Sequence, residues 1–177
     1  MERGKMTCVL GGARSGKSCH ALALAEAAPG RWIYIATAQA FDREMEERIA
    51  RHRDERGPRW RTLEAPLDLP EAIEVVDGGP DDAILVDCLT LWLSNLMLAG
   101  IDAEARTRDL LSALSRCRSH AILVTNEVGL GIVPDNALGR AFRDAAGRLN
   151  QAVAAAADDA VMMVAGLSLL LKGNARS

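Results

Sequence analysis

A glycine-rich segment near the N-terminus carries the first recognisable chemistry of this sequence. Residues 11–18 read Gly-Gly-Ala-Arg-Ser-Gly-Lys-Ser and match the pattern GxxxxGK[ST] in full. Glycines let the backbone wrap closely around a phosphate, and N–H groups at a helix N-terminus attract its charge. Lys17 is expected to reach the β- and γ-phosphates, and the Ser18 hydroxyl to bind Mg²⁺. The segment predicts a nucleotide site formed by Gly11, Gly12, Ala13, Arg14, Ser15, Gly16, Lys17 and Ser18.

A carboxylate follows the apolar run Ala83–Val86. A phosphate loop needs an acidic partner at the end of a neighbouring strand to hold the metal ion, and Asp87 stands at such an end. The same side chain could instead cap the helix that follows. Because a complete phosphate loop is present, we favour metal coordination by Asp87 together with Ser18.

A histidine lies within a cluster of arginines, namely Arg48, Arg51, Arg53 and Arg56. His52 follows Ile49 by three residues and Met45 by seven, so on a helix it continues their inward face. Clustered guanidinium groups would attract a triphosphate and keep the imidazole neutral, which suits a nucleophile. On these residues alone, a solvated basic helix end explains the cluster better.

Short apolar runs alternate with longer amphipathic segments along the chain. This pattern predicts an α/β, P-loop NTPase-like fold with a mostly parallel central sheet and helices on both faces. The expected strands are Thr7–Leu10, Trp32–Ala36, Arg61–Glu64, Ala83–Val86, Ala121–Thr125 and Ala160–Val164. The expected helices are Gly16–Ala28, a segment from Asp42 to just before Gly57, Leu69–Val76, Leu89–Ala99, Ala103–Cys117 and Asn136–Ala156.

No repeat or linker divides the chain, so residues 1–177 are expected to form one nucleotide-binding domain with flexible ends at 1–6 and 173–177. Apolar residues make up 49% and charged residues 25%, and the net charge of −3 gives no general reason for nucleic-acid or membrane affinity. The longest apolar stretch, Ala160–Leu171, is shorter than the roughly 20 residues of a membrane-spanning helix. The four cysteines lack metal-binding spacing and are expected to be reduced thiols. Without a visible signal peptide, the prediction is a cytoplasmic protein with no membrane insertion.

The surroundings of the loop distinguish between types of P-loop protein. A GTPase switch needs an NKxD segment, but in Thr125-Asn126-Glu127-Val128 a glutamate replaces the lysine. No DxxG segment begins at Asp87 either. A small-molecule kinase therefore fits the sequence better than a GTPase switch.

Further segments join the phosphate loop in a characteristic order and spacing. They are Tyr-Ile-Ala-Thr-Ala at 34–38, Arg48-Ile49 followed by His52-Arg53, Trp-Arg-Thr-Leu-Glu at 60–64, and Thr-Asn-Glu-Val-Gly-Leu-Gly-Ile-Val-Pro at 125–134. Together they closely resemble the adenosylcobinamide kinase/adenosylcobinamide-phosphate guanylyltransferase family. The likeness runs from about Thr7 to Leu171, and the segment at 125–134 is its most specific part.

The resemblance implies two reactions. A nucleoside triphosphate, ATP or GTP, phosphorylates the aminopropanol hydroxyl of adenosylcobinamide. GTP then guanylylates a histidine, and the GMP passes to adenosylcobinamide phosphate to give adenosylcobinamide-GDP and pyrophosphate. The family's histidine matches His52, which favours the nucleophile over the solvated helix end. Mg²⁺ is the implied cofactor.

The resemblance also implies GTP contacts beyond the phosphate loop. The matching positions are Ala36, Thr37, Ala38, Arg53, Asp54, Glu55, Arg56, Glu64 and Asp87. A homo-oligomer, a trimer in the family, is implied as well. Asn126, Glu127 and Gly129–Pro134 are expected to form a functional loop, because loops at the carboxyl ends of parallel strands bind ligands.

Two other functions stay open on the sequence. One is a P-loop kinase that phosphorylates another alcohol without guanylyl transfer, and the other is a regulator that senses GTP. Away from the site, His20 and His120 are expected to be structural. Trp92 and Leu93 are expected to lie in the core or in a subunit contact rather than against a corrin ring.

Overall fold

The computed structural model describes residues 3–39 and 57–173. Its strands form one seven-stranded sheet in the order β3-β2-β4-β5-β1-β6-β7, in which every pair is parallel except β6 and β7. The strands are β1 (Met6–Gly11), β2 (Trp32–Ala36), β3 (Trp60–Glu64), β4 (Ala83–Asp87), β5 (His120–Asn126), β6 (Asp159–Val164) and β7 (Leu167–Lys172). The helices are α1 (Lys17–Glu26), α3 (Leu69–Val76), α4 (Leu89–Leu98), α5 (Ala103–Arg116) and α6 (Ala137–Ala156).

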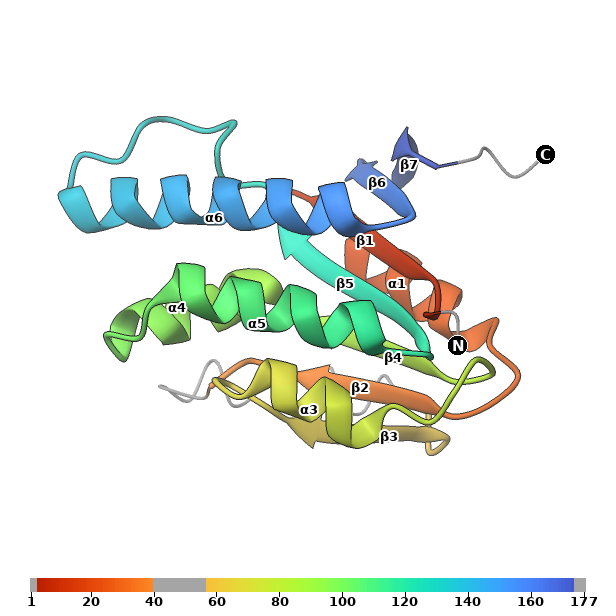
Figure 1. The fold of residues 1–177 in the computed structure, drawn as a ribbon. Coiled ribbons are helices and arrows are strands. Elements are labelled where there is room, and N and C mark those ends of the chain that lie inside the picture. The colour runs from red at the N-terminus through yellow and green to blue at the C-terminus, as the bar shows by residue number, and fades with distance from the viewer. Residues whose placement is uncertain (1–2, 40–56, 174–177) are drawn as a thin grey trace.

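Helices cover both faces of this sheet (Figure 1). On one face, α1 packs through Ala21 and Ala25 onto a cluster that includes Val9, Leu85 and Val124. The other face carries α3, α4, α5 and α6 over a second and larger apolar cluster. Successive strand residues point to opposite faces, and helices cover both faces. The central strands are therefore apolar on both sides and form continuous apolar runs in the sequence.

The predicted α/β fold with a mostly parallel sheet is confirmed. All six predicted strands are present, although β1 and β5 each continue to a residue that borders the phosphate loop, Gly11 and Asn126. Five of the predicted helices are present, and the one expected from Asp42 lies outside the described residues. Within the expected flexible end at 1–6, Met6 belongs to β1 and Arg3 makes two 2.8 Å hydrogen bonds with Asp158.

Sequence analysis missed the last strand. The apolar stretch from Ala160 is split by Ala165 and Gly166, whose φ angles are 52° and 81°. Two consecutive residues with positive φ form the two-residue turn that suits the twist of an antiparallel hairpin. Alanine rarely adopts this conformation, so the turn was not visible in the sequence. The predicted strand Ala160–Val164 is confirmed as β6, and the residues after the turn form β7, which was not predicted.

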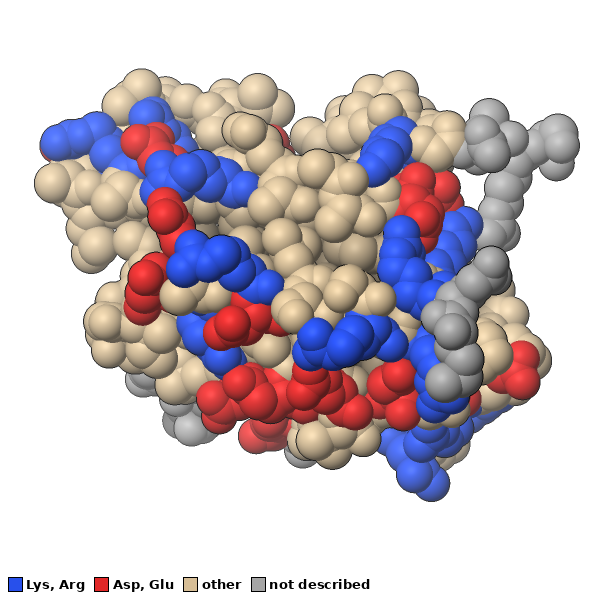
Figure 2. Space-filling model, viewed as in Figure 1, with Lys and Arg blue, Asp and Glu red and all other residues tan. Residues whose placement is uncertain are grey.

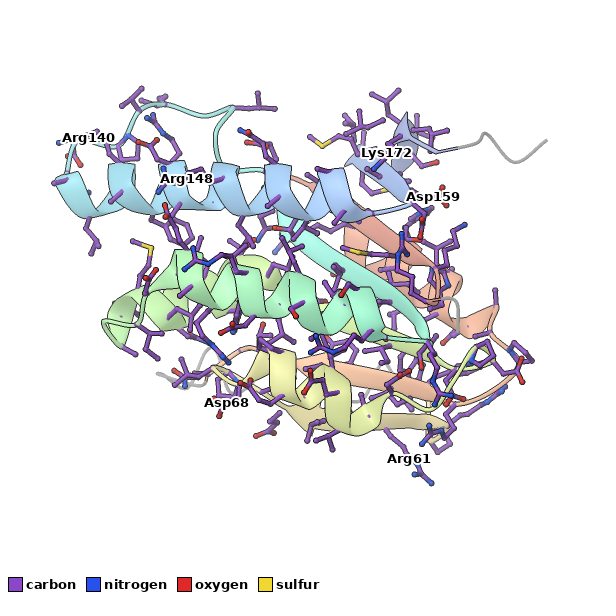
Figure 3. The ribbon with its side chains drawn as sticks, viewed as in Figure 1. Arg61, Asp68, Arg140, Arg148, Asp159 and Lys172 are labelled. Carbon is purple, nitrogen blue, oxygen red and sulfur yellow. The ribbon has the colours of Figure 1, made fainter. Side chains whose placement is uncertain are left out.

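Charges of both signs intermingle on the face formed by α3, α5 and α6 (Figure 2). Arg106 pairs with Glu71 at 2.7 Å, and Arg148 pairs with Glu104 at 3.4 Å. At the sheet edge, Arg61 points outward from β3 (Figure 3). Within residues 3–39 and 57–173, no helix is long and apolar enough to cross a membrane.

Candidate active site

The phosphate loop joins the end of β1 to the start of α1, as its sequence requires. Gly16 precedes the helix with a φ of 94°, a left-handed conformation that glycine adopts without strain. A Cβ on Gly11 would lie 2.4 Å from the Ser15 Oγ and 2.9 Å from the Met163 carbonyl oxygen. These two glycines are therefore required by the loop's tight path.

The loop contains a buried polar atom without a partner. The Ser15 Oγ is the buried side-chain N or O atom that makes no hydrogen bond within the described part of the chain, and Ser15 is 8% exposed. Buried hydroxyls almost always have a partner, so this one fits a ligand oxygen held inside the loop. The Lys17 Nζ donates to the Gly12 carbonyl at 2.9 Å, which places its ammonium over the same backbone. Both groups suit a bound phosphate.

The β6–β7 hairpin supports the phosphate loop. The Gly166 N–H donates to the Ser15 carbonyl at 3.0 Å. A Cβ on Gly16 would lie 3.2 Å from the Gly166 Cα, so the two backbones are in close contact. The turn that sequence analysis missed is therefore part of the structure that holds the loop.

Asp87 lies at the carboxyl end of β4, where its Oδ2 accepts a 3.1 Å hydrogen bond from the Tyr34 hydroxyl. By strand alternation it faces the α1 side, as Leu85 does. We expected this carboxylate on a strand next to the phosphate-loop strand, but β5 lies between β4 and β1. Asp87 and the loop are therefore one strand apart, and the end of β5 lies between them.

The charges of Lys17 and Asp87 both act on Cys88. Burial is the main cause that raises the pKa of this thiol to about 11, and the Asp87 carboxylate raises it further while Lys17 lowers it. Cys88 is thus a neutral thiol near pH 7. Lys17 at the start of α1 and Asp87 at the end of β4 therefore both influence the same buried thiol.

The segment 36–38 begins at the same level of the sheet as Asp87. Ala36 is in register with Glu64 on β3 and with Asp87 on β4. Thr37 is fully buried, and its Oγ1 both donates to the Cys88 carbonyl and accepts from the Cys88 N–H, each at 2.8 Å. The Thr37 side chain therefore fixes this loop to the end of β4.

A buried asparagine of α4 holds the same loop through hydrogen bonds. The Asn95 Nδ2 of α4 donates to the Thr37 carbonyl at 2.8 Å and to the Pro66 carbonyl at 3.0 Å. The indole of Trp92, one turn earlier, donates to the Leu67 carbonyl at 2.9 Å. Helix α4 thus ties together the loops that follow β2 and β3. Sequence reasoning missed Asn95, although an asparagine inside the apolar helix Leu-Thr-Leu-Trp-Leu-Ser-Asn-Leu-Met-Leu is a visible signal.

The segment 125–134 starts beside the phosphate loop. Asn126 is in register with Gly11, and the Glu127 N–H donates to the Gly11 carbonyl at 3.1 Å. Further along, Leu130 and Ile132 are 83% and 98% exposed. The specific segment recognised in the sequence therefore leaves the sheet next to the candidate phosphate site.

The structure brings most of the expected site residues together at the carboxyl ends of the strands. The phosphate loop, the segment 36–38, Glu64 and Asp87 lie at the carboxyl ends of β1, β2, β3 and β4. His52 and the segment Arg53, Asp54, Glu55 and Arg56 lie outside the described residues. Sequence reasoning also missed the hydroxyl of Tyr34, although the segment 34–38 had been singled out.

Residues expected to be structural are accounted for in part. Trp92 and Leu93 are 0% and 1% exposed, so both belong to the core as expected. The His120 Nε2 forms a 2.9 Å hydrogen bond with the Thr7 hydroxyl between two parallel strands, which agrees with a structural role. The role of His20 stays a prediction. The four cysteines are free thiols, as expected.

Comparisons with known proteins agree with this arrangement. The fold is shared with the flagellar accessory protein FlaH from Methanocaldococcus jannaschii, with a TM-score of 0.58 and 15% identity over 98% of this chain and 80% of that one. Three relatives match by sequence. The bifunctional adenosylcobalamin biosynthesis protein CobU is 46% identical in Salmonella typhimurium and 42% identical in Escherichia coli, each over 94% of this chain and 99% of the relative. CobP of Pseudomonas aeruginosa, which carries the same description, is 47% identical over 93% of this chain and 96% of the relative.

The family model described as cobinamide kinase / cobinamide phosphate guanyltransferase matches residues 7–171. This span contains the phosphate loop, the segment 36–38, Glu64, Asp87 and the segment 125–134. It agrees with the span of the resemblance read from the sequence. The chain belongs to the cobinamide kinase / cobinamide phosphate guanyltransferase family.

Proposed function

We propose that this chain phosphorylates adenosylcobinamide at the phosphate loop and then transfers GMP from GTP through His52 to the new phosphate. As a member of its family, the chain is a cobinamide kinase and cobinamide phosphate guanyltransferase. One observation carries the proposal for the site. The phosphate loop, with its unpartnered Ser15 hydroxyl, and Asp87 lie at one edge and on one face of the sheet.

For the kinase reaction, the loop binds the triphosphate and Lys17 offsets the negative charge of the β- and γ-phosphates. The Ser15 hydroxyl donates to a phosphate oxygen. A hydroxyl, a carboxylate and phosphate oxygens are the ligands that Mg²⁺ prefers, so Ser18 and Asp87 would hold the ion. When bound, Mg²⁺ neutralises charge that develops on the phosphates. The Tyr34 hydroxyl orients the Asp87 carboxylate for that role.

For the guanylyl transfer, a nitrogen of His52 attacks the α-phosphorus of GTP, and pyrophosphate leaves. An oxygen of adenosylcobinamide phosphate then displaces the histidine and takes the GMP. The covalent intermediate divides one transfer into two displacements. We expect GTP contacts from the segments 36–38 and 53–56 and from Glu64. Because the Thr37 hydroxyl is bonded to Cys88, contacts from 36–38 come from Ala36, Ala38 and the backbone.

We also propose that the protein is a cytoplasmic homo-oligomer. Strand β7 lies at the edge of the described sheet and exposes Leu167, Leu169 and Leu171 to 75%, 58% and 56%. A long apolar edge strand is a surface that another chain can cover. Light scattering of the full chain measures the mass, and a trimer is expected from the family. A monomer at micromolar concentration would contradict this expectation.

Intact-mass measurement tests the two-reaction proposal against a kinase that lacks guanylyl transfer. The chain is incubated with GTP and Mg²⁺, and with ATP and Mg²⁺ as the matched control. We expect a GMP adduct with GTP only. The adduct should disappear when adenosylcobinamide phosphate is added, because that substrate accepts the GMP. Kinase activity without any adduct would favour the kinase-only alternative.

A further inference from the structure

Three buried polar side chains from different elements meet at the end of β5. Thr90 of α4, Thr125 of β5 and Asn150 of α6 are 7%, 1% and 6% exposed. The Thr125 hydroxyl donates to the Asn150 Oδ1 at 2.7 Å. Its oxygen lies 3.3 Å from the Thr90 Oγ1, so in that contact Thr90 is the donor.

These side chains close a ring around the backbone of Asn126. The Asn126 N–H donates to the Thr90 Oγ1 at 2.7 Å, and the Asn150 Nδ2 donates to the Asn126 carbonyl at 3.0 Å. Each hydroxyl in the ring thus donates one hydrogen bond and accepts at least one. A fully satisfied buried network is rigid and selects one geometry, and here it fixes the backbone of one residue.

The side chain of Asn126 points toward the phosphate loop. Asn126 is in register with Gly11 in a parallel pair, so their Cβ positions lie on the same face of the sheet. A Cβ on Gly11 would point at the Ser15 Oγ, which belongs to the loop. Two residues earlier, Val124 packs in the cluster under α1, which confirms the face.

Asp87 shares this face on the adjacent strand. Because Asp87 is in register with Val124, Asn126 lies one step further along the same face. From strand spacing and rise, the Asp87 and Asn126 Cα atoms are about 8 Å apart. Asn126 therefore lies between the phosphate loop and the carboxylate expected to hold the metal ion.

The carboxamide of Asn126 is available to a ligand, whereas the next side chain already accepts a hydrogen bond within its own turn. Among residues 3–39 and 57–173, no hydrogen-bond partner of the Asn126 side chain is present. The Glu127 Oε1 instead accepts a 2.5 Å hydrogen bond from the Gly129 N–H, which shapes its own turn. A rigid backbone that presents an unbonded amide to a phosphate site is the arrangement of a preorganised donor.

We propose that Asn126 is a catalytic residue of the kinase reaction. Its Nδ2 donates a hydrogen bond to a non-bridging oxygen of the γ-phosphate as charge develops there. A bond forms between the acceptor hydroxyl oxygen and the γ-phosphorus, and the bond from that phosphorus to the β–γ bridging oxygen breaks. The nucleoside diphosphate leaves, the hydroxyl proton passes to solvent, and the amide exchanges no proton. Thr90, Thr125 and Asn150 are positioning residues.

Asn126→Ala in the full chain tests the proposal, with kinase rates measured on adenosylcobinamide. Removing one preorganised donor should lower kcat on the order of 10²-fold. The Kd of a non-hydrolysable triphosphate should change less than about threefold, because the loop and Lys17 still bind it. The melting temperature should stay within about 2 °C of wild type, because the removed amide bonds nothing in the described structure. Gln151→Ala, on an exposed position of α6, is the matched control and should change none of these values.

Two further variants keep the test decisive. Asn126→Asp should lower kcat at least as much and weaken triphosphate binding, because a carboxylate repels phosphate. Thr90→Val should lower kcat about tenfold in wild type and have no further effect in the Asn126→Ala background, since it acts through Asn126. A kcat for Asn126→Ala within twofold of wild type would overturn the proposal. So would a loss of melting temperature that accounts for the lost activity, because the residue would then be structural.

Discussion

The carboxyl edge of the sheet has two halves that are built differently. Around β1 and β5, the candidate phosphate site consists of consecutive residues, 11–18, and the Gly166 N–H supports this loop. Around β2, β3 and β4, the candidate site residues are Ala36, Glu64 and Asp87, which are far apart in sequence and are aligned by strand register. In this second half, side-chain hydrogen bonds from Thr37 and Asn95 hold the strand ends together.

This difference has a consequence for function. A backbone cradle tolerates most side-chain changes, because its N–H groups remain when side chains are replaced. A site assembled from three strand ends depends on the hydrogen bonds that hold them together, from Thr37 to Cys88 and from Asn95 to Thr37. The loop 11–18 should therefore fail mainly through its few functional side chains. The second half, and Asn126 at the end of β5, should also fail through residues that never touch the ligand.

The largest effect is expected from Lys17→Ala. Lysine supplies the mobile cation of the loop, so we expect phosphorylation and guanylylation to fall on the order of 10³-fold or more. The fold should persist because the Lys17 Nζ bonds only the Gly12 carbonyl of its own loop in the described structure. Kinase rates and GMP-adduct formation measure this, with Lys172→Ala on β7 (Figure 3) as the matched control. Near-normal rates in folded Lys17→Ala protein would rule out the loop as the triphosphate site.

Asp87→Asn should have the next largest effect. The change removes the charge but keeps an oxygen that can accept from the Tyr34 hydroxyl, so the melting temperature should be nearly unchanged. Activity should fall about 10²-fold and require more Mg²⁺, because a carboxylate holds the ion more tightly than an amide does. Titration of both reactions with Mg²⁺ measures this, and Asp81→Asn, at an exposed position two residues before β4, is the control. Unchanged metal dependence would mean that Asp87 does not hold the ion and serves only as the acceptor of the Tyr34 hydroxyl.

Two buried asparagines allow a direct comparison of the halves. Asn95→Ala and Asn150→Ala each leave backbone carbonyls without their donors, at a cost of about 1–3 kcal/mol in the free energy of unfolding. Asn95→Ala should mainly raise the KM for GTP in adduct formation, because it loosens the segment 36–38. Asn150→Ala should mainly lower the kcat of the kinase, because it releases Asn126. Parallel kinetics of both variants test this, and equal effects on both reactions would contradict the division into halves.

The smallest effect is expected at the amino-terminal ends of the strands, where Asp158 immediately precedes β6. A hydrogen bond from Arg3 is the main cause that lowers the pKa of Asp158 to about 2, and the Met6 N–H contributes to the shift. The folded pKa lies below that of the unfolded chain, about 3.9, so the ionised group stabilises the fold above that pH. This contribution is lost as the pH falls through about 2.

Asp158→Asn should therefore lower the melting temperature slightly at pH 6 and leave activity unchanged. The difference from wild type should shrink as the pH is lowered from about 4 toward about 2. Thermal unfolding at several pH values measures it. A difference that grows on acidification would mean that another group causes it.

The two halves also differ in how far the sequence predicts them. The phosphate loop could be placed between a strand and a helix, because its pattern lies within eight consecutive residues, although its contact with Gly166 could not be predicted. Asp87 could be placed at the end of a strand. The position of that strand in the sheet could not be predicted, since parallel pairing joins residues distant in sequence. The ties through Asn95, Thr90 and Asn150 were missed because helical periodicity shows a buried face and does not identify the partner of a polar residue on it.

The fold could be predicted because its strongest signals also lie within short continuous segments. The apolar runs of β1, β4 and β5 are buried on both faces and therefore predict a central parallel sheet. The β6–β7 hairpin was missed because its turn depends on a positive φ at Ala165, which the residue type does not indicate. This error concerned the site as well, since Gly166 contacts the phosphate loop.

Covalent labelling of a His52 variant tests the central claim most directly, namely that one chain carries two separable reactions. Wild type and His52→Ala are incubated with GTP labelled in its α-phosphate, and kinase activity is measured in the same preparations. We predict acid-labile, alkali-stable label on wild type and none on His52→Ala, because the bond joins nitrogen to phosphorus. The variant should keep part of its kinase activity, because γ-phosphoryl transfer needs the loop and Mg²⁺ but no histidine nucleophile. Label on His52→Ala at the wild-type rate, or complete loss of kinase activity in a folded variant, would contradict the account.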